Sequence, residues 1–360
     1  MNTVYLLEPL ALAFRLGVAI RSFAYREGWR KTRRLRQPVV SVGNLTVGGT
    51  GKTPLVALVA RTLAKMGLRP AILARGYRRR RGAGLIGLEP SVPGGERTAD
   101  PRAVGDEPAL LARLLPEVPI VVSADRYRAG RLAEDRFAAS AHVLDDGFQH
   151  LKLARDVDIV ALDATRRLSD WALLPAGPQR EPCSALARAD LVVVTRTELA
   201  GSLQLESRVR GISPGVPIFH ARTKLCLLVD VATGKRHPPS AFKWEAVGVF
   251  CGIGNPLAFF CDVVSWGFPI AVGCDFAFPD HHVYTHAELR RLESQAIESD
   301  VGALLTTEKD AMNLPAGAVT RLPVYACAIE LEITEAHEFE RELASRLAAG
   351  DGRLTMGKRP

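Results

Sequence analysis

The sequence lacks the cysteine spacings that build disulfide frameworks and structural zinc sites. Its 360 residues include six cysteines, and no two of them form a C-x-x-C pair. Scattered cysteines of this kind fit a reducing compartment, and we expect them to act as small core residues. The chain also has no internal repeat and no long low-complexity tract, so its length favours two ordinary globular domains.

A second absence is an uncharged hydrophobic run long enough to span a membrane. Residues 4–25 are strongly apolar, but Glu8, Arg15 and Arg21 interrupt them, and a spanning helix needs about 20 apolar residues. Basic residues follow this stretch and no small-residue cleavage site is evident, which argues against a signal peptide. Two interpretations remain: a helix at the surface of an anionic bilayer, or a helix packed on the protein's own core. We expect residues 1–36 to associate with a membrane, which would indicate a lipid-embedded substrate.

Aromatic RNA-binding platforms and DNA-reading motifs are also missing, although the net charge is +8. The positive charge is concentrated in two runs, which indicates an anionic partner. Because no recognition motif accompanies them, we do not expect nucleic acid to be that partner. The runs are Arg21, Arg26, Arg30, Lys31, Arg33, Arg34 and Arg36, and then Arg75, Arg78, Arg79, Arg80 and Arg81.

The most informative feature present is a short strand that leads into a glycine-rich loop and ends in Gly51-Lys52-Thr53. This is the pattern of a phosphate-binding loop, whose backbone N–H groups surround phosphate oxygens. We expect Lys52 to reach the β- and γ-phosphates, the Thr53 hydroxyl to bind Mg²⁺, and a helix beginning at about Thr53 to add its positive dipole end. The predicted nucleotide-binding residues are Thr46, Val47, Gly48, Gly49, Thr50, Gly51, Lys52 and Thr53.

Short apolar strands alternate with helical segments over residues 37–221. This alternation predicts an α/β fold with a doubly wound, mainly parallel sheet of the P-loop NTPase type, and a ligand at the carboxyl ends of the strands. Residues 222–240 predict a β-ribbon hinge, and a second strand–helix series over 241–349 predicts a smaller α/β domain. We expect residues 350–360 to form a disordered tail.

Two pairs of adjacent carboxylates are candidates for chemistry. The apolar strand at 142–144 leads into Asp145 and Asp146; we expect Asp145 to bind Mg²⁺ or its water shell and Asp146 to orient its neighbours. Asp106 and Glu107 stand at a predicted helix start, where the helix dipole favours the ionised form. A phosphotransferase needs one carboxylate that accepts or positions the proton of the attacking hydroxyl. The alternatives are a solvated turn for the first pair and an ordinary helix start for the second.

Histidines suggest further candidates. His281 and His282 lie in a loop before a helix predicted at 285–299, but adjacent histidines chelate poorly and no third ligand lies nearby in the sequence. The loop either caps that helix or carries a histidine that meets a catalytic carboxylate when two domains close. His150 either contacts a phosphate or sugar or packs at the surface.

Taken together, these stretches resemble the tetraacyldisaccharide 4′-kinase (lipid A 4′-kinase) family of Gram-negative bacteria. The matches follow the family order over roughly residues 4–330, and the Thr46 that departs from the general loop pattern resembles this family's own hydroxyl residue. The stretches that carry the resemblance are Val42–Pro54, Arg75–Tyr77, Gly105–Pro108, Asp145–His150, Leu174–Pro182, Gly252–Pro256, Phe278–His281 and Thr306–Asp310.

The resemblance implies transfer of the ATP γ-phosphate to the 4′-hydroxyl of a tetraacylated glucosamine disaccharide 1-phosphate. It also implies ATP and Mg²⁺ as cofactors and a monotopic enzyme at the cytoplasmic face of the bacterial inner membrane. Asp106 resembles the catalytic base, His281 its partner from the second domain, and Thr53, Glu107 and Asp145 the Mg²⁺ environment. Lys52 completes the catalytic set, and the expected substrate contacts are Asp146, Gln149, His150 and Arg180. The sequence gives no indication of an obligatory protein partner.

Two other functional classes compete with a lipid kinase. A nucleotide-dependent switch or metallochaperone would share the phosphate-binding loop, but the nearest stretch to a guanine-reading Asn-Lys-x-Asp, Thr195–Glu198, lacks both the Asn and the Asp. A non-enzymatic membrane adaptor would leave the loop, both acid pairs and the histidine loop unexplained. The sequence therefore favours the kinase.

Overall fold

The chain divides into two compact units, which are described separately. The computed structural model describes residues 3–352 except 78, 80–83, 93–94, 96, 167–171, 316 and 318–319. Unit 1 comprises Met1–Ala221 and Ile333–Pro360, and unit 2 comprises Arg222–Glu332. Two strands, β8 (Ile218–Asp230) and β13 (Val324–Ile333), contain the points where the chain passes between the units.

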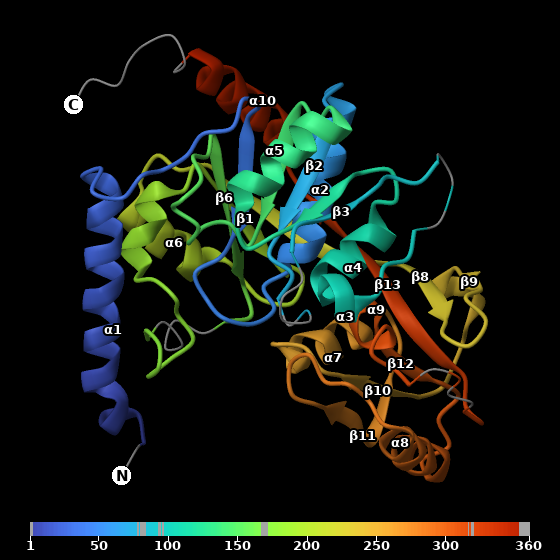
Figure 1. Ribbon diagram of the computed structural model, residues 1–360. Helices are drawn as coiled ribbons and strands as arrows, with labels where there is room; N and C mark the ends of the chain where they lie inside the picture. Colours follow the sequence, from blue (N-terminus) through green and yellow to red (C-terminus); the bar gives the residue numbers. More distant parts are fainter. Residues whose placement is uncertain are drawn as a thin grey trace. The chain divides into compact units, whose positions relative to one another are not determined.

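The sheet of unit 1 is mainly parallel (Figure 1). Its order is β7-β6-β1-β5-β2-β4-β3, with the start of β8 beside β7; β3 runs antiparallel to β4 and the other neighbours are parallel. This arrangement confirms the predicted α/β class. The strands are β1 (Val39–Gly43), β2 (Pro70–Ala74), β3 (Ile86–Leu88), β4 (Ile120–Val122), β5 (Ala141–Asp145), β6 (Val157–Asp163) and β7 (Leu191–Thr195).

Helices pack on this sheet through apolar clusters. Ala129 and Ala133 of α5 pack with Val39 and Leu73 of the strands, and α6 packs in a separate cluster with residues of β6 and β7. Every residue of β1, β5, β6 and β7 is buried, as expected for parallel strands covered on both faces. The helices are α1 (Thr3–Arg26), α2 (Lys52–Lys65), α3 (Pro101–Val104), α4 (Asp106–Leu114), α5 (Arg126–Phe137), the 3₁₀ segment η2 (Cys183–Arg188), α6 (Leu203–Ile212) and α10 (Ala336–Gly352).

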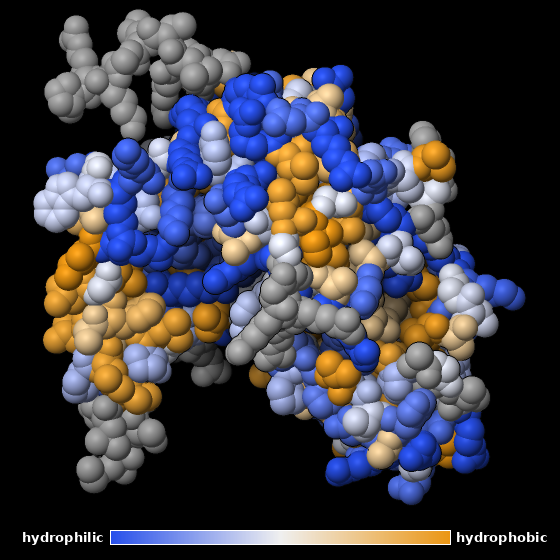
Figure 2. Space-filling model, in the orientation of Figure 1, coloured by the Kyte–Doolittle hydropathy of each residue, from blue (hydrophilic) through white to orange (hydrophobic). Residues whose placement is uncertain are grey.

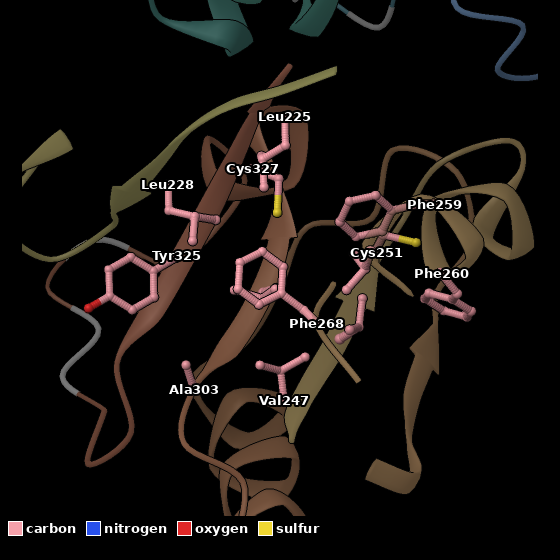
Figure 3. Packing of buried hydrophobic residues seen from close by; sticks show 13 residues of the cluster. Leu225, Leu228, Val247, Cys251, Phe259, Phe260, Phe268, Ala303, Tyr325 and Cys327 are labelled. Atoms are coloured by element: carbon pink, nitrogen blue, oxygen red, sulfur yellow. The ribbon is translucent and has the colours of Figure 1, made fainter. Parts of the chain in front are cut away.

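Unit 2 contains parallel strands in the order β11-β10-β12-β13. Phe259 and Phe260 of α7 pack with Val247 and Cys251 of β10 and with other buried residues (Figure 3). The elements are β9 (Arg236–His237), which pairs with β8, η3 (Pro239–Ala241), β10 (Val247–Cys251), α7 (Pro256–Ser265), β11 (Ile270–Ala277), α8 (His286–Glu298), β12 (Leu304–Thr307) and α9 (Glu308–Ala311).

The structure refines the predicted organisation in two respects. All six cysteines are free thiols. Cys251, Cys274 and Cys327 are buried, so these three are core residues as expected. Residues from Ile333 onward belong to unit 1, whereas the sequence analysis placed residues 241–349 together in a second domain. The difference arises because β13 returns the chain to unit 1. Helix α10 extends to Gly352, and residues 353–360 of the expected tail lie outside the described residues.

His220 of β8 connects three elements of unit 1. Its backbone N–H donates to Glu335 Oε2 at 3.0 Å, its Nδ1 lies 2.8 Å from Glu335 Oε1, and its Nε2 lies 2.9 Å from Glu206 Oε1. Glu206 belongs to α6, and Glu335 immediately precedes α10. Burial alone would lower the pKa of His220, but the hydrogen bonds with Glu206 and Glu335 outweigh it and raise the pKa above its ordinary value.

We expect His220→Gln to lower the free energy of unfolding by about 1–2 kcal/mol near pH 5.5 and by much less near pH 8.5. The folded-state pKa lies above the unfolded value of about 6.5. The protonated ring therefore stabilises the fold fully below that value, and the stabilisation is lost as pH rises through the folded-state pKa. Urea titrations at the two pH values measure the difference.

His337→Gln is the matched control, because His337 is exposed on α10. It should show the same small effect at both pH values. An equal loss of stability at both pH values for His220→Gln would contradict the proposed charged network.

Candidate active site

The phosphate-binding loop of unit 1 lies between β1 and α2. Gly51 precedes Lys52, the first residue of α2, and has a φ of 74°, in the left-handed region that favours glycine. Within the loop, Asn44 Nδ2 donates to Thr50 Oγ1 at 2.9 Å and to Thr46 Oγ1 at 3.5 Å. The two threonine hydroxyls therefore help to shape the loop, and the start of α2 supplies a helix dipole beside it.

Asp145 and Asp146 lie at the carboxyl end of the strand next to β1. Asp145 is the last residue of β5 and lies in register with Val42 of β1. Asp146 Oδ1 lies 3.4 Å from Lys52 Nζ, and its Oδ2 accepts a hydrogen bond from Arg180 Nη1 at 2.7 Å. Burial alone would raise the pKa of Asp146, but these two cations lower it to about 2. The structure thus brings together three of the residues predicted from the sequence.

The carboxyl group of Asp145 is buried among other negative charges. Burial, together with the charges of Asp146 and Glu107, raises the pKa of Asp145 to about 7. The described residues contain no cluster of three or more His, Cys, Asp or Glu that could hold a metal ion. Mg²⁺ beside a nucleotide is held differently, by one or two protein groups together with phosphates and waters. A buried carboxyl group kept partly protonated by its neighbours fits such an ion, whose charge would favour the ionised form.

Asp106 and Glu107 begin α4 at a place where two glycines allow chain segments to meet. Gly105 has a φ of 99°, and a Cβ on it would lie 2.8 Å from Tyr77 O. Gly76 has a φ of 68°, and a Cβ on it would lie 2.6 Å from a carbonyl oxygen of α3. The backbone around Gly76 therefore packs directly on the backbone around Gly105, and this contact fixes the positions of Asp106 and Glu107. The charge of Glu107 acts on Asp145, as expected for neighbouring members of one site.

The segment Leu174–Pro182 lies against the phosphate-binding loop. Val47 N donates to Pro178 O at 2.8 Å, and Arg180 N donates to Leu45 O at 2.7 Å. These backbone bonds hold Arg180 where its guanidinium group reaches the aspartate after β5. The two backbone hydrogen bonds could not be predicted from the family motifs, because they depend on the path of the loop in the folded protein.

Gln149 is placed as part of the framework around the loop. Its Nε2 donates to Asn44 O at 2.9 Å and to Glu181 Oε2 at 3.2 Å, and Glu181 also accepts from Arg188 Nη2 at 2.8 Å. Gln149 was predicted from the sequence to contact substrate. Its amide nitrogen instead bonds to the protein in this structure, so its substrate contact stays a prediction.

His150 and Arg126 lie in the same charged region. Burial lowers the pKa of His150 to about 4, and nearby cations lower it as well, so its ring is neutral near pH 7. These cations are Arg126, Arg155, Lys152 and Arg21. Arg126 is only 3% exposed, donates to Ser123 O at 3.0 Å, and acts electrostatically on Asp145. Arg126 is not among the residues predicted from the sequence, because an arginine at the first position of a helix is usually solvated.

Unit 2 contains a second group of loops, which follow β10, β11 and β12. A single buried carboxylate joins them: Asp310 is 1% exposed. Its Oδ1 accepts from Gly252 N at 2.8 Å and from Tyr284 Oη at 2.9 Å, and its Oδ2 accepts from Thr307 Oγ1 at 2.5 Å. Three separate sequence motifs of the second domain are therefore parts of one constellation.

His281 belongs to this constellation. Its φ of 62° is uncommon for a residue with a side chain, and its backbone N–H donates to Gly252 O at 3.0 Å. A Cβ on Gly252 would lie 2.9 Å from Pro279 O, so glycine is required for the histidine loop to approach. Because His281 is in unit 2 and Asp106 in unit 1, their pairing stays a prediction.

A family profile described as Tetraacyldisaccharide-1-P 4'-kinase matches residues 3–348. The chain belongs to this family. The tetraacyldisaccharide 4'-kinase of Syntrophus aciditrophicus is 38% identical over 96% of this chain and 93% of that protein. The corresponding protein of Geobacter metallireducens is 40% identical over 93% of this chain and 96% of that protein.

A solved structure supports the same assignment. A crystal structure of LpxK from Aquifex aeolicus in complex with ATP is 30% identical to this chain, with a TM-score of 0.73, and covers 96% of this chain and 100% of that chain. These similarities confirm the family predicted from the motifs and disfavour the switch, metallochaperone and adaptor alternatives.

Gly105→Ala should slow this kinase on the order of 10- to 100-fold, because the new methyl group would displace the start of α4 and the two acids on it. The strained backbone should also lower the free energy of unfolding by about 1–3 kcal/mol. Steady-state turnover and urea unfolding measure the two effects.

Gly201→Ala provides the control, since a Cβ on Gly201 meets nothing within 4 Å. That variant should keep wild-type turnover. If Gly105→Ala also keeps it, the glycine contact does not position the acids.

Proposed function

We propose that the protein transfers the γ-phosphate of ATP to the 4′-hydroxyl of a tetraacylated glucosamine disaccharide 1-phosphate, a step in lipid A biosynthesis. The family membership supports a phosphotransfer to an alcohol, and the ATP complex of the Aquifex aeolicus relative supports ATP as the donor. The observation that carries the proposal is the grouping of Lys52, Asp146 and Arg180 beside the buried Asp145 at the phosphate-binding loop.

The residues of unit 1 divide the work of phosphate binding. Backbone N–H groups of the loop and the α2 dipole would bind phosphate oxygens, and Lys52 would stabilise the negative charge on the transferred group. Asp146 contacts Lys52 through one carboxylate oxygen and accepts from Arg180 through the other. A bound Mg²⁺, held by Thr53 and Asp145 with Glu107 nearby, would neutralise charge on the β- and γ-phosphates.

Asp106 would accept the proton of the acceptor 4′-hydroxyl as the new P–O bond forms. Its position at the first turn of α4 favours the ionised carboxylate that this role needs. His281 would orient this carboxylate when units 1 and 2 close, so that the site is complete only with substrates bound. The main requirement is in-line positioning and charge neutralisation, because the attacking hydroxyl is a weak acid.

An assay with ATP, Mg²⁺ and the tetraacyl disaccharide 1-phosphate in detergent micelles tests the reaction. We expect a 4′-phosphorylated product, and a loss of turnover on the order of 10²-fold or more for Asp106→Asn and for His281→Ala. Mass spectrometry of the lipid identifies the product and its position.

Exposed residues of the same types serve as controls: Asp300→Asn and His337→Gln should keep turnover. Folded wild-type protein that forms no 4′-phosphate would refute the reaction. Near-normal turnover of Asp106→Asn and His281→Ala would refute only their assigned roles.

Membrane association is the second part of the proposal. No helix among the described residues is long and apolar enough to cross a membrane. Helix α1 carries an exposed apolar stripe at helical spacing, visible as orange atoms on the left of Figure 2. The stripe consists of Leu12, Leu16, Ile20 and Phe23, which are 66%, 61%, 57% and 40% exposed. Such a stripe suits the interface of a bilayer, and we place the enzyme at the cytoplasmic face of the bacterial inner membrane as a monotopic protein.

The end of α1 adds aromatic and basic groups to this stripe. Trp29 is 75% exposed and packs edge-on against Phe23, with ring centroids 5.3 Å apart, and Arg26 lies over the Phe23 ring. Exposed aromatic and cationic side chains favour the headgroup region. Not all of the basic run is available for lipid: Arg34 pairs with Asp156 at 2.7 Å. Part of the run therefore attaches the segment after α1 to the sheet.

Replacing Leu12, Leu16 and Ile20 together with serine should weaken binding to vesicles containing phosphatidylglycerol by roughly 10-fold or more, because each exposed side chain loses apolar contact with lipid. Cosedimentation measures the binding, and turnover in micelles shows whether the kinase site is intact.

A matched control replaces Leu203, Leu257 and Val272, which are exposed elsewhere, with serine. It should bind vesicles like wild type. Unchanged vesicle binding by the α1 variant would refute the role of the stripe.

A further inference from the structure

The ammonium group of Lys309 contacts the histidine loop of unit 2. Lys309 Nζ lies 2.9 Å from Asp280 Oδ1 and 3.4 Å from His281 Nε2. The side chains of Lys309 and His281 are only 16% and 9% exposed, whereas that of Asp280 is 39% exposed. A contact between an ammonium group and an imidazole nitrogen is directional, because the ammonium group can only donate a hydrogen bond and the ring nitrogen must accept it.

The fold fixes the position of Lys309 from two sides. It is the second residue of α9, whose N-cap Thr307 accepts a hydrogen bond from Asp310 N at 3.1 Å. Asp310 in turn accepts from Gly252 N, and Gly252 O accepts from His281 N. One chain of hydrogen bonds thus sets the backbone of both Lys309 and His281, so their side chains are held at a defined separation.

The chemistry of the two groups then determines which ring nitrogen carries the proton. An ammonium group has three donors and no acceptor, so His281 Nε2 accepts in the contact with Lys309. The nearest Asp280 oxygen is 3.7 Å from the same nitrogen, beyond hydrogen-bond distance, and that carboxylate bonds to Lys309 instead. In the neutral ring the proton therefore resides on Nδ1, and Nδ1–H is the donor that a carboxylate would meet.

We infer that Lys309, itself held by Asp280, is a positioning residue that fixes the ring orientation and the Nδ1–H tautomer of His281. This inference rests on the proposed function for one point only, that His281 orients the catalytic carboxylate. Without Lys309, Nε2 would lose this donor, and a ring with its proton on Nε2 would present an acceptor to that carboxylate. The motif Thr306–Asp310 would thereby contribute to catalysis without touching substrate.

Kinetics of five variants of the full-length enzyme test the inference. Lys309→Met should lower kcat roughly 10-fold or more and leave the KM for ATP within about 2-fold of wild type. Lys309→Arg keeps a cationic donor and should retain more of kcat than Lys309→Met. Combining Lys309→Met with His281→Ala should be no slower than His281→Ala alone, because Lys309 acts through that ring. Lys243→Met, an exposed lysine of the same unit, is the control with unchanged kinetics.

A spectroscopic measurement separates positioning from a purely structural role. Nitrogen-15 NMR of histidine-labelled enzyme distinguishes protonated from unprotonated ring nitrogens, and the His281→Ala spectrum assigns the signals. We expect a protonated Nδ1 and an unprotonated Nε2 in the wild type, and a shift toward the Nε2–H tautomer in Lys309→Met. An unchanged tautomer in a folded Lys309→Met variant would overturn the inference.

The outcomes also separate this inference from the proposed function. Wild-type turnover by His281→Ala would refute the catalytic role of His281. If His281→Ala is slow and adding Lys309→Met lowers kcat by the same factor as it does in the wild type, only the inference would be overturned. A large rise in the KM for ATP with an unchanged kcat would also overturn it, because Lys309 would then be a nucleotide-binding residue.

Discussion

Val42 of β1 lies beside Asp145 of β5, and the chemistry of unit 1 depends on this register. Because the strands are parallel, the phosphate-binding loop after β1 and the aspartates after β5 emerge at the same edge of the sheet. Gly43 allows the close approach that follows, since a Cβ on it would lie 2.6 Å from the Cβ of Phe148. A one-residue slip of either strand would turn Asp145 toward the opposite face and separate it from the loop.

Several carboxylates lie close together at this edge of the sheet, and burial disfavours their ionised forms unless cations lie nearby. Asp146 stays ionised, with a pKa of about 2, because Lys52 and Arg180 contact it. For Asp145, burial and the charges of Asp146 and Glu107 outweigh the nearby cations and raise the pKa to about 7. Two adjacent aspartates thus acquire different properties from different surroundings. Asp146 serves as a permanent charge that orients the cations, and Asp145 is suited to a ligand role in which a bound cation favours its ionised form.

The sequence is sufficient to predict the residues whose chemistry is local. The phosphate-binding loop and Asp145 each follow an apolar strand, so their place at the sheet edge follows from the fold class. Arg126 could not be predicted in this way, because the charges that act on it belong to segments distant in the sequence, among them Arg75 and Asp145. The same holds for Gln149, whose amide is recognisable but whose bond to Glu181 exists only in the folded protein. Pairing between remote segments likewise decides that the chain from Ile333 onward belongs to unit 1.

The proposed catalytic base, Asp106, and its proposed partner, His281, belong to different units, which bears on substrate specificity. Asp106 occupies a helix start in unit 1, and His281 contacts Lys309 and Gly252 of unit 2. These contacts position each group within its own unit, and the proposed pairing of the two would need closure of the units. A site completed by closure transfers phosphate poorly to water, because a small nucleophile supplies little binding energy for closure. A large lipid acceptor would supply much more, so the proposed closure would favour the lipid hydroxyl over hydrolysis of ATP.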